Sequence, residues 1–294
     1  MSAVTRPGLA PAQGIPAPAP MAPTPMAPTP TAPATVAGRV TQVRVVRAEW
    51  TKLRALRSTR WCALAAAALI VGLGAAIAGS GTPYKISAGN TAAAGVSVAL
   101  IGVLFAALVV GVVGVLAFSG EYGTGMIRAT LAVVPARLPV LWAKVIVLVG
   151  LVLPVTLLCT FAGFFAAAAI ESSRGGSVLS LTDPGVLRTV AGASLYLTVV
   201  VIIGLALGAL LRKTAAGLSV FAAVFFVIPV IVPALPHSIT GWAPYLPSNA
   251  GGALWGSPLG SANALSPWTG FACLCGYAVV LTALAAWQLR RRDA

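Results

Sequence analysis

The sequence contains very few acidic side chains and a single histidine. Among the 294 residues, the acids are Glu49, Glu121, Glu171, Asp183 and Asp293, and the histidine is His237. None of them lies in the middle of a long apolar stretch. Intramembrane proteases, proton-driven carriers and ion pumps depend on ionisable groups at membrane depth, so these classes of protein are disfavoured. The sequence also lacks a glycine-rich phosphate loop ending in Lys-Ser or Lys-Thr, which argues against ATP binding by that route.

Cysteine is scarce as well. The four cysteines are Cys62, Cys159, Cys273 and Cys275, all within or at the edge of apolar stretches. On a helix, Cys273 and Cys275 would point about 200° apart, so they cannot bind one metal ion together. This pattern predicts structural thiols, with no disulfide framework, no metal site and no directly bound cofactor.

The sequence does contain six long runs that are almost free of charge. A helix needs about 20 apolar residues to cross the hydrocarbon core of a membrane. Strands of a membrane barrel would be shorter and would alternate with polar residues, whereas these runs are continuously apolar. We therefore predict an all-α membrane protein in which each helix satisfies its own backbone hydrogen bonds. The six transmembrane helices are expected at about residues 61–79, 91–118, 141–170, 189–211, 214–235 and 268–289.

Lysine and arginine are concentrated in every second gap between the runs. They lie before the first run, between the second and third, between the fourth and fifth, and after the last. Positively charged loops stay in the cytoplasm, so we predict a multi-pass protein of the cell membrane with both termini cytoplasmic. The same residues account for nearly all of the net charge of +14, and anionic membrane lipids are sufficient partners for them. We expect no nucleic-acid partner, because the chain has no soluble basic domain that could read bases.

Residues 1–38 are rich in proline, alanine and threonine. They carry ten of the 22 prolines and repeat the pentapeptide Met-Ala-Pro-Thr-Pro from Met21. Such a composition favours polyproline II and cannot form a packed core, so we predict a disordered tail. Binding of a partner that recognises proline-rich sequences is the alternative interpretation.

Residues 39–60 have the pattern of a basic amphipathic helix. Val43, Val46, Trp50 and Leu53 recur at spacings of three and four, with basic residues on the other faces. A helix of this kind lies in the plane of the lipid headgroups. The basic residues also act as a topology signal, and the two interpretations are compatible. The six-helix membrane domain then covers residues 61–289, and residues 290–294 form a basic cytoplasmic end.

The gap at residues 119–140 lies on the predicted cytoplasmic side. After several glycines, Ile127, Leu131 and Val134 fall on one helical face, and Pro135 is expected to end the helix. A short amphipathic helix at this place is suited to docking a soluble partner. An ordinary interfacial loop with turn glycines is an equally good interpretation.

Two short features predict contacts between helices. The two-residue gap at Arg212 and Lys213 forces the fourth and fifth helices to run antiparallel as neighbours. Gly204 and Gly208 form a face of small residues that allows another helix to approach closely. The outer loop at 236–267 is rich in aromatic residues, which is typical of an interfacial belt.

Three stretches resemble the permease subunits of type-2 ATP-binding-cassette (ABC) exporters of the actinobacterial type. The first is RAEWTKLR at 47–54 with RSTRW at 57–61. The second is EYGTGMIR at 121–128 with PAR at 135–137 and Lys144, and the third is YLPSNAG at 245–251. With six apolar runs in the matching order, the resemblance covers about residues 40–292.

The resemblance implies a membrane permease that depends on a separate cytoplasmic ATPase. In this family two permease subunits, identical or different, form the pathway, and two ATPase subunits bind ATP and Mg²⁺. It implies export, and an apolar pathway with few charges is compatible with an amphiphilic substrate. Because the sequence lacks its own ATP-binding motif, we expect that the chain is not itself an enzyme. The alternative function is a non-transporting membrane scaffold or immunity protein that binds a peptide or a lipid.

The resemblance also implies roles for three groups of residues. The coupling helix, which transmits movement of the ATPase, would include Glu121, Tyr122, Gly123, Thr124, Gly125, Ile127, Arg128 and Leu131. The interfacial connecting helix would include Glu49, Trp50, Lys52, Leu53, Arg54 and Arg57. In the same family the outer loop forms short re-entrant helices, so that an outer gate would include Tyr245, Pro247 and Asn249.

Overall fold

The computed structural model describes residues 41–80, 92–126, 137–174, 180–236, 240–257 and 265–291. The predicted tail at 1–38 lies outside the described residues.

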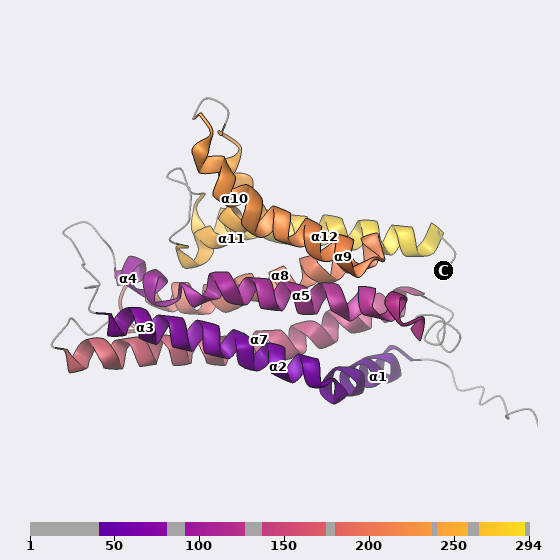
Figure 1. The fold of residues 1–294 in the computed structure, drawn as a ribbon, viewed down its shortest axis with the longest axis horizontal. Helices are drawn as coiled ribbons and strands as arrows, with labels where there is room; N and C mark the ends of the chain where they lie inside the picture. Colours follow the sequence, from indigo (N-terminus) through magenta and orange to yellow (C-terminus); the bar gives the residue numbers. More distant parts are fainter. Residues whose placement is uncertain are drawn as a thin grey trace, which may run out of the picture. The chain divides into compact units, whose positions relative to one another are not determined.

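Helices make up the regular secondary structure of the described part of the chain (Figure 1). Six helical segments are long and apolar enough to cross a membrane. They are Arg57–Gly79, Gly102–Gly123, Leu138–Ser173, Val186–Leu211, Thr214–Ala234 and Pro267–Arg291. The prediction of an all-α membrane protein with six transmembrane helices is confirmed.

Four of the six spans lie within single helices, and two change helix type along their length. The single helices are α5 (Gly102–Gly123), α7 (Arg137–Ser173), α8 (Val186–Leu211) and α12 (Pro267–Arg291). The first span consists of α2 (Arg57–Ala67), the π-helical turn η1 (Ala68–Gly72) and α3 (Leu73–Gly79). The fifth consists of α9 (Thr214–Ala222), the π-helical turn η2 (Ala223–Val227), α10 (Ile228–Ile231) and η3 (Val232–Ala234).

Helix α8 lies at the centre of the bundle. It packs against α5, α7, α9 and α12, and a larger share of its apolar span is buried than in any of the other five spans. Lipid tails are as apolar as leucine, so burial of apolar surface does not by itself bring membrane helices together. Close van der Waals contact has to do so, and the residues of α8 permit it.

Glycines allow α8 and α5 to touch backbone to backbone. A Cβ atom built on Gly204 would lie 2.5 Å from the carbonyl oxygen of Gly111, and one on Gly208 would collide with the backbone of Val115. The predicted close contact at Gly204 and Gly208 is therefore present, and α5 is the partner helix.

The second span differs from the prediction of one continuous helix at 91–118. A turn at residues 100–101 separates α4 (Ala92–Ala99) from α5. There the N–H groups of Ile101 and Val103 donate to carbonyl groups three residues earlier, which is the tighter 3₁₀ pattern. Gly102 lies against the backbone of Leu69 in η1, closer than any Cβ would allow. The first and second spans thus leave regular α geometry where they touch each other.

The connection between α8 and α9 is a sharp turn. Arg212 adopts the left-handed conformation with φ 55°, and its N–H donates to the carbonyl oxygen of Gly208 at 3.1 Å. Helix α9 then packs back against α8. This confirms that the fourth and fifth spans are antiparallel neighbours.

The substitution Gly204→Ala is expected to lower the free energy of unfolding by about 1 to 3 kcal/mol, because overpacked cores must shift backbone or side chains. The reason is the 2.5 Å separation between an added Cβ and the Gly111 carbonyl oxygen. The measurement is the Tm of the purified protein in detergent. Gly150→Ala in α7 is the control, since nothing lies within 4 Å of a Cβ at that position. Equal Tm values for the two variants would contradict the close contact.

Candidate functional site

A short helix, α1 (Gln42–Ala55), precedes the first span. It ends at Leu56, whose extended backbone (φ −73°, ψ 116°) separates it from α2. Helix α1 packs along the beginning of α7, where Val45 clusters with Val140 and Ala143. The amphipathic segment expected at 39–60 therefore contains the whole of α1 and the beginning of α2.

The face of α1 that contacts the bundle includes only part of the apolar stripe seen in the sequence, namely Val46 and Leu53. Val43 is 61% exposed and Trp50 is 36% exposed, whereas the buried residues of α1 are Val45 and Glu49. A buried carboxylate is costly unless cations pair with it. The partners of Glu49 therefore decide how α1 is held.

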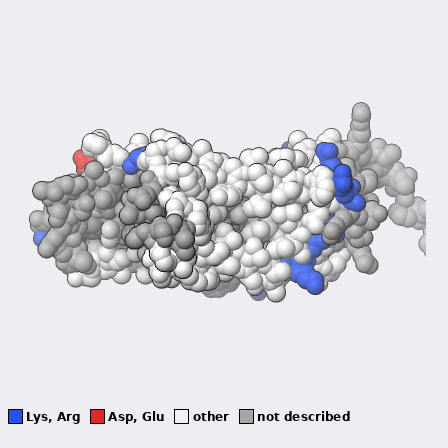
Figure 2. Space-filling model, turned by 90° about the horizontal axis from the view of Figure 1, so that it is seen from above, with Lys and Arg blue, Asp and Glu red and all other residues white. Residues whose placement is uncertain are grey.

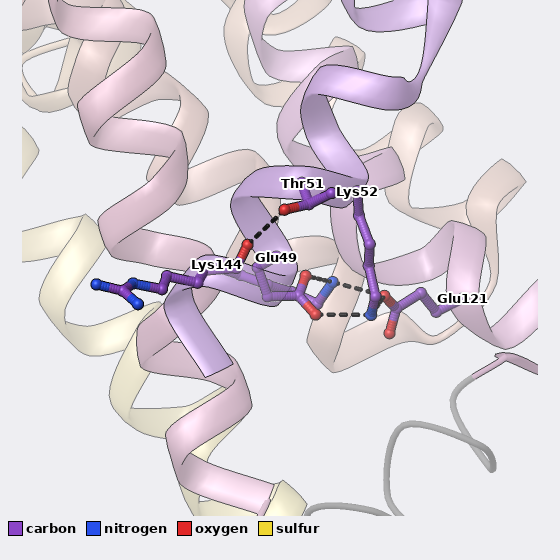
Figure 3. A network of polar contacts seen from close by, with 6 residues as sticks. Glu49, Thr51, Lys52, Glu121 and Lys144 are labelled. Atoms are coloured by element: carbon purple, nitrogen blue, oxygen red, sulfur yellow. Dashed lines mark hydrogen bonds and ion pairs between the residues drawn. The ribbon is translucent and has the colours of Figure 1, made fainter. Parts of the chain in front are cut away.

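Glu49 belongs to a closed ring of four charged side chains, which we name the charge network (Figure 3). The Lys52 Nζ lies 2.7 Å from Glu49 Oε1 and 3.2 Å from Glu121 Oε1. The Lys144 Nζ lies 2.8 Å from Glu49 Oε2 and 2.8 Å from Glu121 Oε1. Helix α1 supplies Glu49 and Lys52, α5 supplies Glu121 and α7 supplies Lys144. The charge network thus joins three helices that are distant in sequence.

Two carboxylates and two ammonium groups neutralise each other in the charge network. The side chains of Glu49 and Lys144 are only 4% and 5% exposed, while that of Lys52 is 34% exposed. Each ammonium group contacts both carboxylates, which offsets the cost of removing the charges from water. Lys144 Nζ also lies 5.9 Å from the ring centroid of Phe118, within the range of a cation–π interaction.

The charge network shifts the pKa values of its two members on α1. Burial by itself raises the pKa of Glu49, but the attraction and hydrogen bonds of Lys144 and Lys52 outweigh it and hold that pKa below its ordinary value. Burial by itself lowers the pKa of Lys52, and the bonds to Glu49 and Glu121 raise it above its ordinary value instead. Both groups are therefore charged across the neutral pH range.

The end of α5 also contacts the turn between α8 and α9. The guanidinium carbon of Arg212 lies 5.3 Å from the ring centroid of Tyr122. Thr214 Oγ1 donates to Ser119 Oγ at 3.1 Å. The last turns of α5 are therefore connected to α1 and α7 through Glu121 and to the α8–α9 turn through their other polar side chains.

A cavity of about 520 Å³ lies beside the charge network. All four members of the charge network line it, together with apolar side chains that include Leu53, Leu116 and Leu148. The ion pairs therefore border open space as well as packed helices, which leaves room for α1, α5 and α7 to shift relative to one another.

Part of the segment expected to form the coupling helix is described. Glu121, Tyr122 and Gly123 are the last residues of α5, and Thr124 and Gly125 follow as a turn. The other expected members, Ile127, Arg128 and Leu131, lie outside the described residues. The described part is thus the end of a transmembrane helix, bound directly to α1 and α7.

The residues expected in the connecting helix lie in three different surroundings. Glu49 and Lys52 belong to the charge network, and Arg57 is the first residue of α2. The other three, Trp50, Leu53 and Arg54, line a second cavity, which lies between α1, α2, α5 and α7.

The residues expected at an outer gate lie at the other end of the bundle from α1 (Figure 1). Tyr245 ends the 3₁₀ turn η5 (Ala243–Tyr245), and Pro247 begins α11 (Pro247–Trp255). Asn249 Nδ2 donates to the Ala243 carbonyl oxygen at 2.9 Å, and the Tyr245 carbonyl oxygen accepts from the Tyr277 hydroxyl at 3.0 Å. With nine residues, α11 is too short to cross a membrane. It packs on α8 and α12 as a cap at this end.

Sequence reasoning did not find the pairing of Glu49 with Lys144. From the sequence, Lys144 is one of several basic residues on one side of the membrane. The missed signal is its position inside the apolar span Leu138–Ser173, where a lysine needs a counter-ion. With only five acids in the chain, the choice of partners was small.

The charge network connects helices. Its carboxylates and ammonium groups are paired with one another. Within the described ranges, no group of three or more His, Cys, Asp or Glu side chains is placed to bind a metal ion. The site is suited to mechanical connection of α1, α5 and α7.

The substitution Lys144→Ala is expected to destabilise the protein by about 3 to 5 kcal/mol, because it leaves two buried carboxylates facing each other. Lys52→Ala should cost clearly less, since that side chain is 34% exposed. Thermal unfolding in detergent measures both. In the double variant Glu49→Leu/Lys144→Met, much of the loss should be recovered, because no unpaired charge remains between these two positions. Independent, additive effects of the two substitutions would contradict direct pairing.

The stability of the protein should fall in acid as Glu49 takes up a proton. A carboxylate with a lowered pKa stabilises the folded state at pH values above its unfolded pKa of about 4.3, and this contribution is lost as the pH falls through the lower folded value. The Tm difference between the wild type and Glu49→Gln should therefore shrink on acidification. Lys52, whose pKa is raised, contributes fully below its unfolded pKa of about 10.4, and its contribution is lost only as the pH rises further. A constant Tm difference between wild type and Glu49→Gln in acid would contradict the assignment.

A comparison with known protein families identifies the family of the chain. A family model described as "ABC-2 family transporter protein" matches residues 45–232, which is more than half of the chain. The match begins in α1, includes all four members of the charge network and ends in η3. No curated protein matches the chain. With its six transmembrane helices, the chain belongs to the ABC-2 family of transporter proteins and is a membrane permease of that family.

Proposed function

We propose that this permease exports an amphiphilic substrate with energy from ATP that a separate cytoplasmic subunit hydrolyses. The observation that carries the proposal is the charge network, which binds α1 to the end of α5 and the beginning of α7. A connection of this kind transmits force between helices. The sequence has no phosphate loop of its own, so ATP and Mg²⁺ are assigned to the partner subunit.

In this mechanism the ATPase contacts the segment that begins at the end of α5 and includes Arg128. A displacement of that segment moves Glu121, and Glu121 carries Lys52 of α1 and Lys144 of α7 with it through the bonds of the charge network. Helix α8 follows α5, because the glycine contacts hold their backbones together. ATP binding and hydrolysis would then shift the population of the permease between inward-open and outward-open states. Two permease subunits, identical or different, would form the pathway.

The orientation in the membrane is part of the proposal. On the face seen in Figure 2, most lysine and arginine side chains gather at one end, beyond a wide band without charged side chains. Helix α1 and the C-terminal end of α12 lie together at one end of the bundle (Figure 1). The tendency of positive residues to stay inside supports assigning this end to the cytoplasm of the cell. The α11 end, with Tyr245, Pro247 and Asn249, would then face outward as the outer gate.

The expected outcome of affinity purification from native membranes is a complex of the permease with an ATP-hydrolysing subunit. Glu121→Ala and Arg128→Ala should each lower the amount of ATPase recovered per permease by about 5-fold or more. This is the lower end of the affinity changes usual between coupled binding sites. The measurement is quantitative mass spectrometry of the complex, with its ATPase rate. Leu158→Ala, a 72% exposed position in α7, is the control. Absence of an ATPase from the wild-type preparation, or equal recovery with all variants, would favour a non-transporting membrane protein.

A further inference from the structure

The second cavity, between α1, α2, α5 and α7, has a volume of about 390 Å³. This lies within the range of about 300 to 1,000 Å³ that is usual for sites of small ligands. The helices around it expose large apolar side chains, including Trp61 at 71%, Leu64 at 60% and Leu108 at 41%. In a membrane protein such surfaces face lipid or another subunit, so the cavity opens beside the bilayer and not toward bulk water.

Most of the side chains that α2, α5 and α7 contribute to this cavity are apolar. Helix α2 contributes alanines, and α5 and α7 contribute valines: Ala63, Ala66, Val109, Val113, Val152 and Val155. The small alanine side chains leave the space that the valines border from the other helices. From Thr59 to Ala66 the cavity follows α2 for about 10 Å, at a rise of 1.5 Å per residue. This shape suits a hydrocarbon chain.

The part of the cavity formed by α1 and the beginning of α2 is basic. Arg54, Arg60 and Trp50 line it, and Arg60 Nη2 donates to the Arg54 carbonyl oxygen at 3.1 Å, which keeps the two residues together. None of the side chains that line the cavity is acidic. The two acids nearby in the structure, Glu49 and Glu121, are paired with lysines of the charge network. Two guanidinium groups and an indole above an apolar slot match the headgroup region of an anionic lipid.

We propose that this cavity binds an anionic phospholipid from the leaflet on the α1 side of the membrane. The phosphate lies at Arg54 and Arg60, and one acyl chain lies between the alanines of α2 and the valines of α5 and α7. Leu53 borders both this cavity and the one beside the charge network. The bound lipid therefore stabilises the position of α1, and it does so whether or not an ATPase drives the permease.

Cys62 provides a direct probe, because it lines the cavity. The full-length chain is purified in detergent, titrated with phosphatidylglycerol or phosphatidylcholine, and treated with N-ethylmaleimide; peptide mass spectrometry then gives the labelling rate of each cysteine. Phosphatidylglycerol should slow the labelling of Cys62 and leave Cys159 of α7 unchanged, since Cys159 does not line the cavity. In Arg54→Gln/Arg60→Gln, half-protection should need about 30-fold more phosphatidylglycerol, as expected for two arginines at a lipid surface.

Matched variants separate the cavity from the general surface. Arg57→Gln removes a neighbouring charge that does not line the cavity, and it should leave the protection unchanged. Val113→Phe should fill the slot and lower the amount of phosphatidylglycerol retained in native mass spectrometry, whereas Leu108→Phe on the same helix should not. Equal protection by phosphatidylcholine, or unchanged protection in the double arginine variant, would overturn the proposal. So would protection that needs no added lipid and rises with protein concentration, because a second copy would then cover the cavity.

Discussion

Charge neutralisation inside an apolar bundle is the constraint on which the candidate site depends. Glu49 and Lys144 are almost completely buried, and neither could be held there alone without a large loss of solvation free energy. Each is stable only while the other and the remaining two members of the charge network stay in place. The positions of α1, α5 and α7 relative to one another therefore depend on these ion pairs as well as on the apolar cluster of Val45, Val140 and Ala143.

The rest of the bundle is held together by a different kind of contact. Where lipid surrounds the helices, association depends on how closely backbones approach, and small residues decide that distance. Between α5 and α8, glycines allow the two backbones to approach closely. Gly102 allows the same close approach between η1 and α5, and the chain next to it forms a tighter 3₁₀ turn at residues 100–101. The permease thus combines two closely packed helices, α5 and α8, with the charge network at one end of α5.

Much of this fold follows from the sequence, because a span needs a long apolar run and a two-residue gap leaves only one way for the next helix to turn. The helix break before Gly102 does not follow, since it arises from contact with Leu69, a residue on another span. The resemblance to known permeases singled out Glu49, Lys52 and Glu121, yet it assigned them to two separate helices with separate roles. Which of these residues meet depends on which side of α1 faces the bundle. Of the apolar stripe, Val46 and Leu53 pack there, while Val43 and Trp50 are exposed. Whether an acidic side chain is buried depends on which other helices pack against it, and the spacing of apolar residues along one helix does not predict this.

The two lysines of the charge network differ in their access to water. This difference predicts the order in which their ion pairs break. The side chain of Lys144 is 5% exposed, while that of Lys52 is 34% exposed. Water can therefore replace the carboxylates around Lys52 at a smaller cost than those around Lys144. When α1 moves, the contacts of Lys52 should therefore break before those of Lys144. Helix α1 would then rotate about its contact with Lys144 of α7.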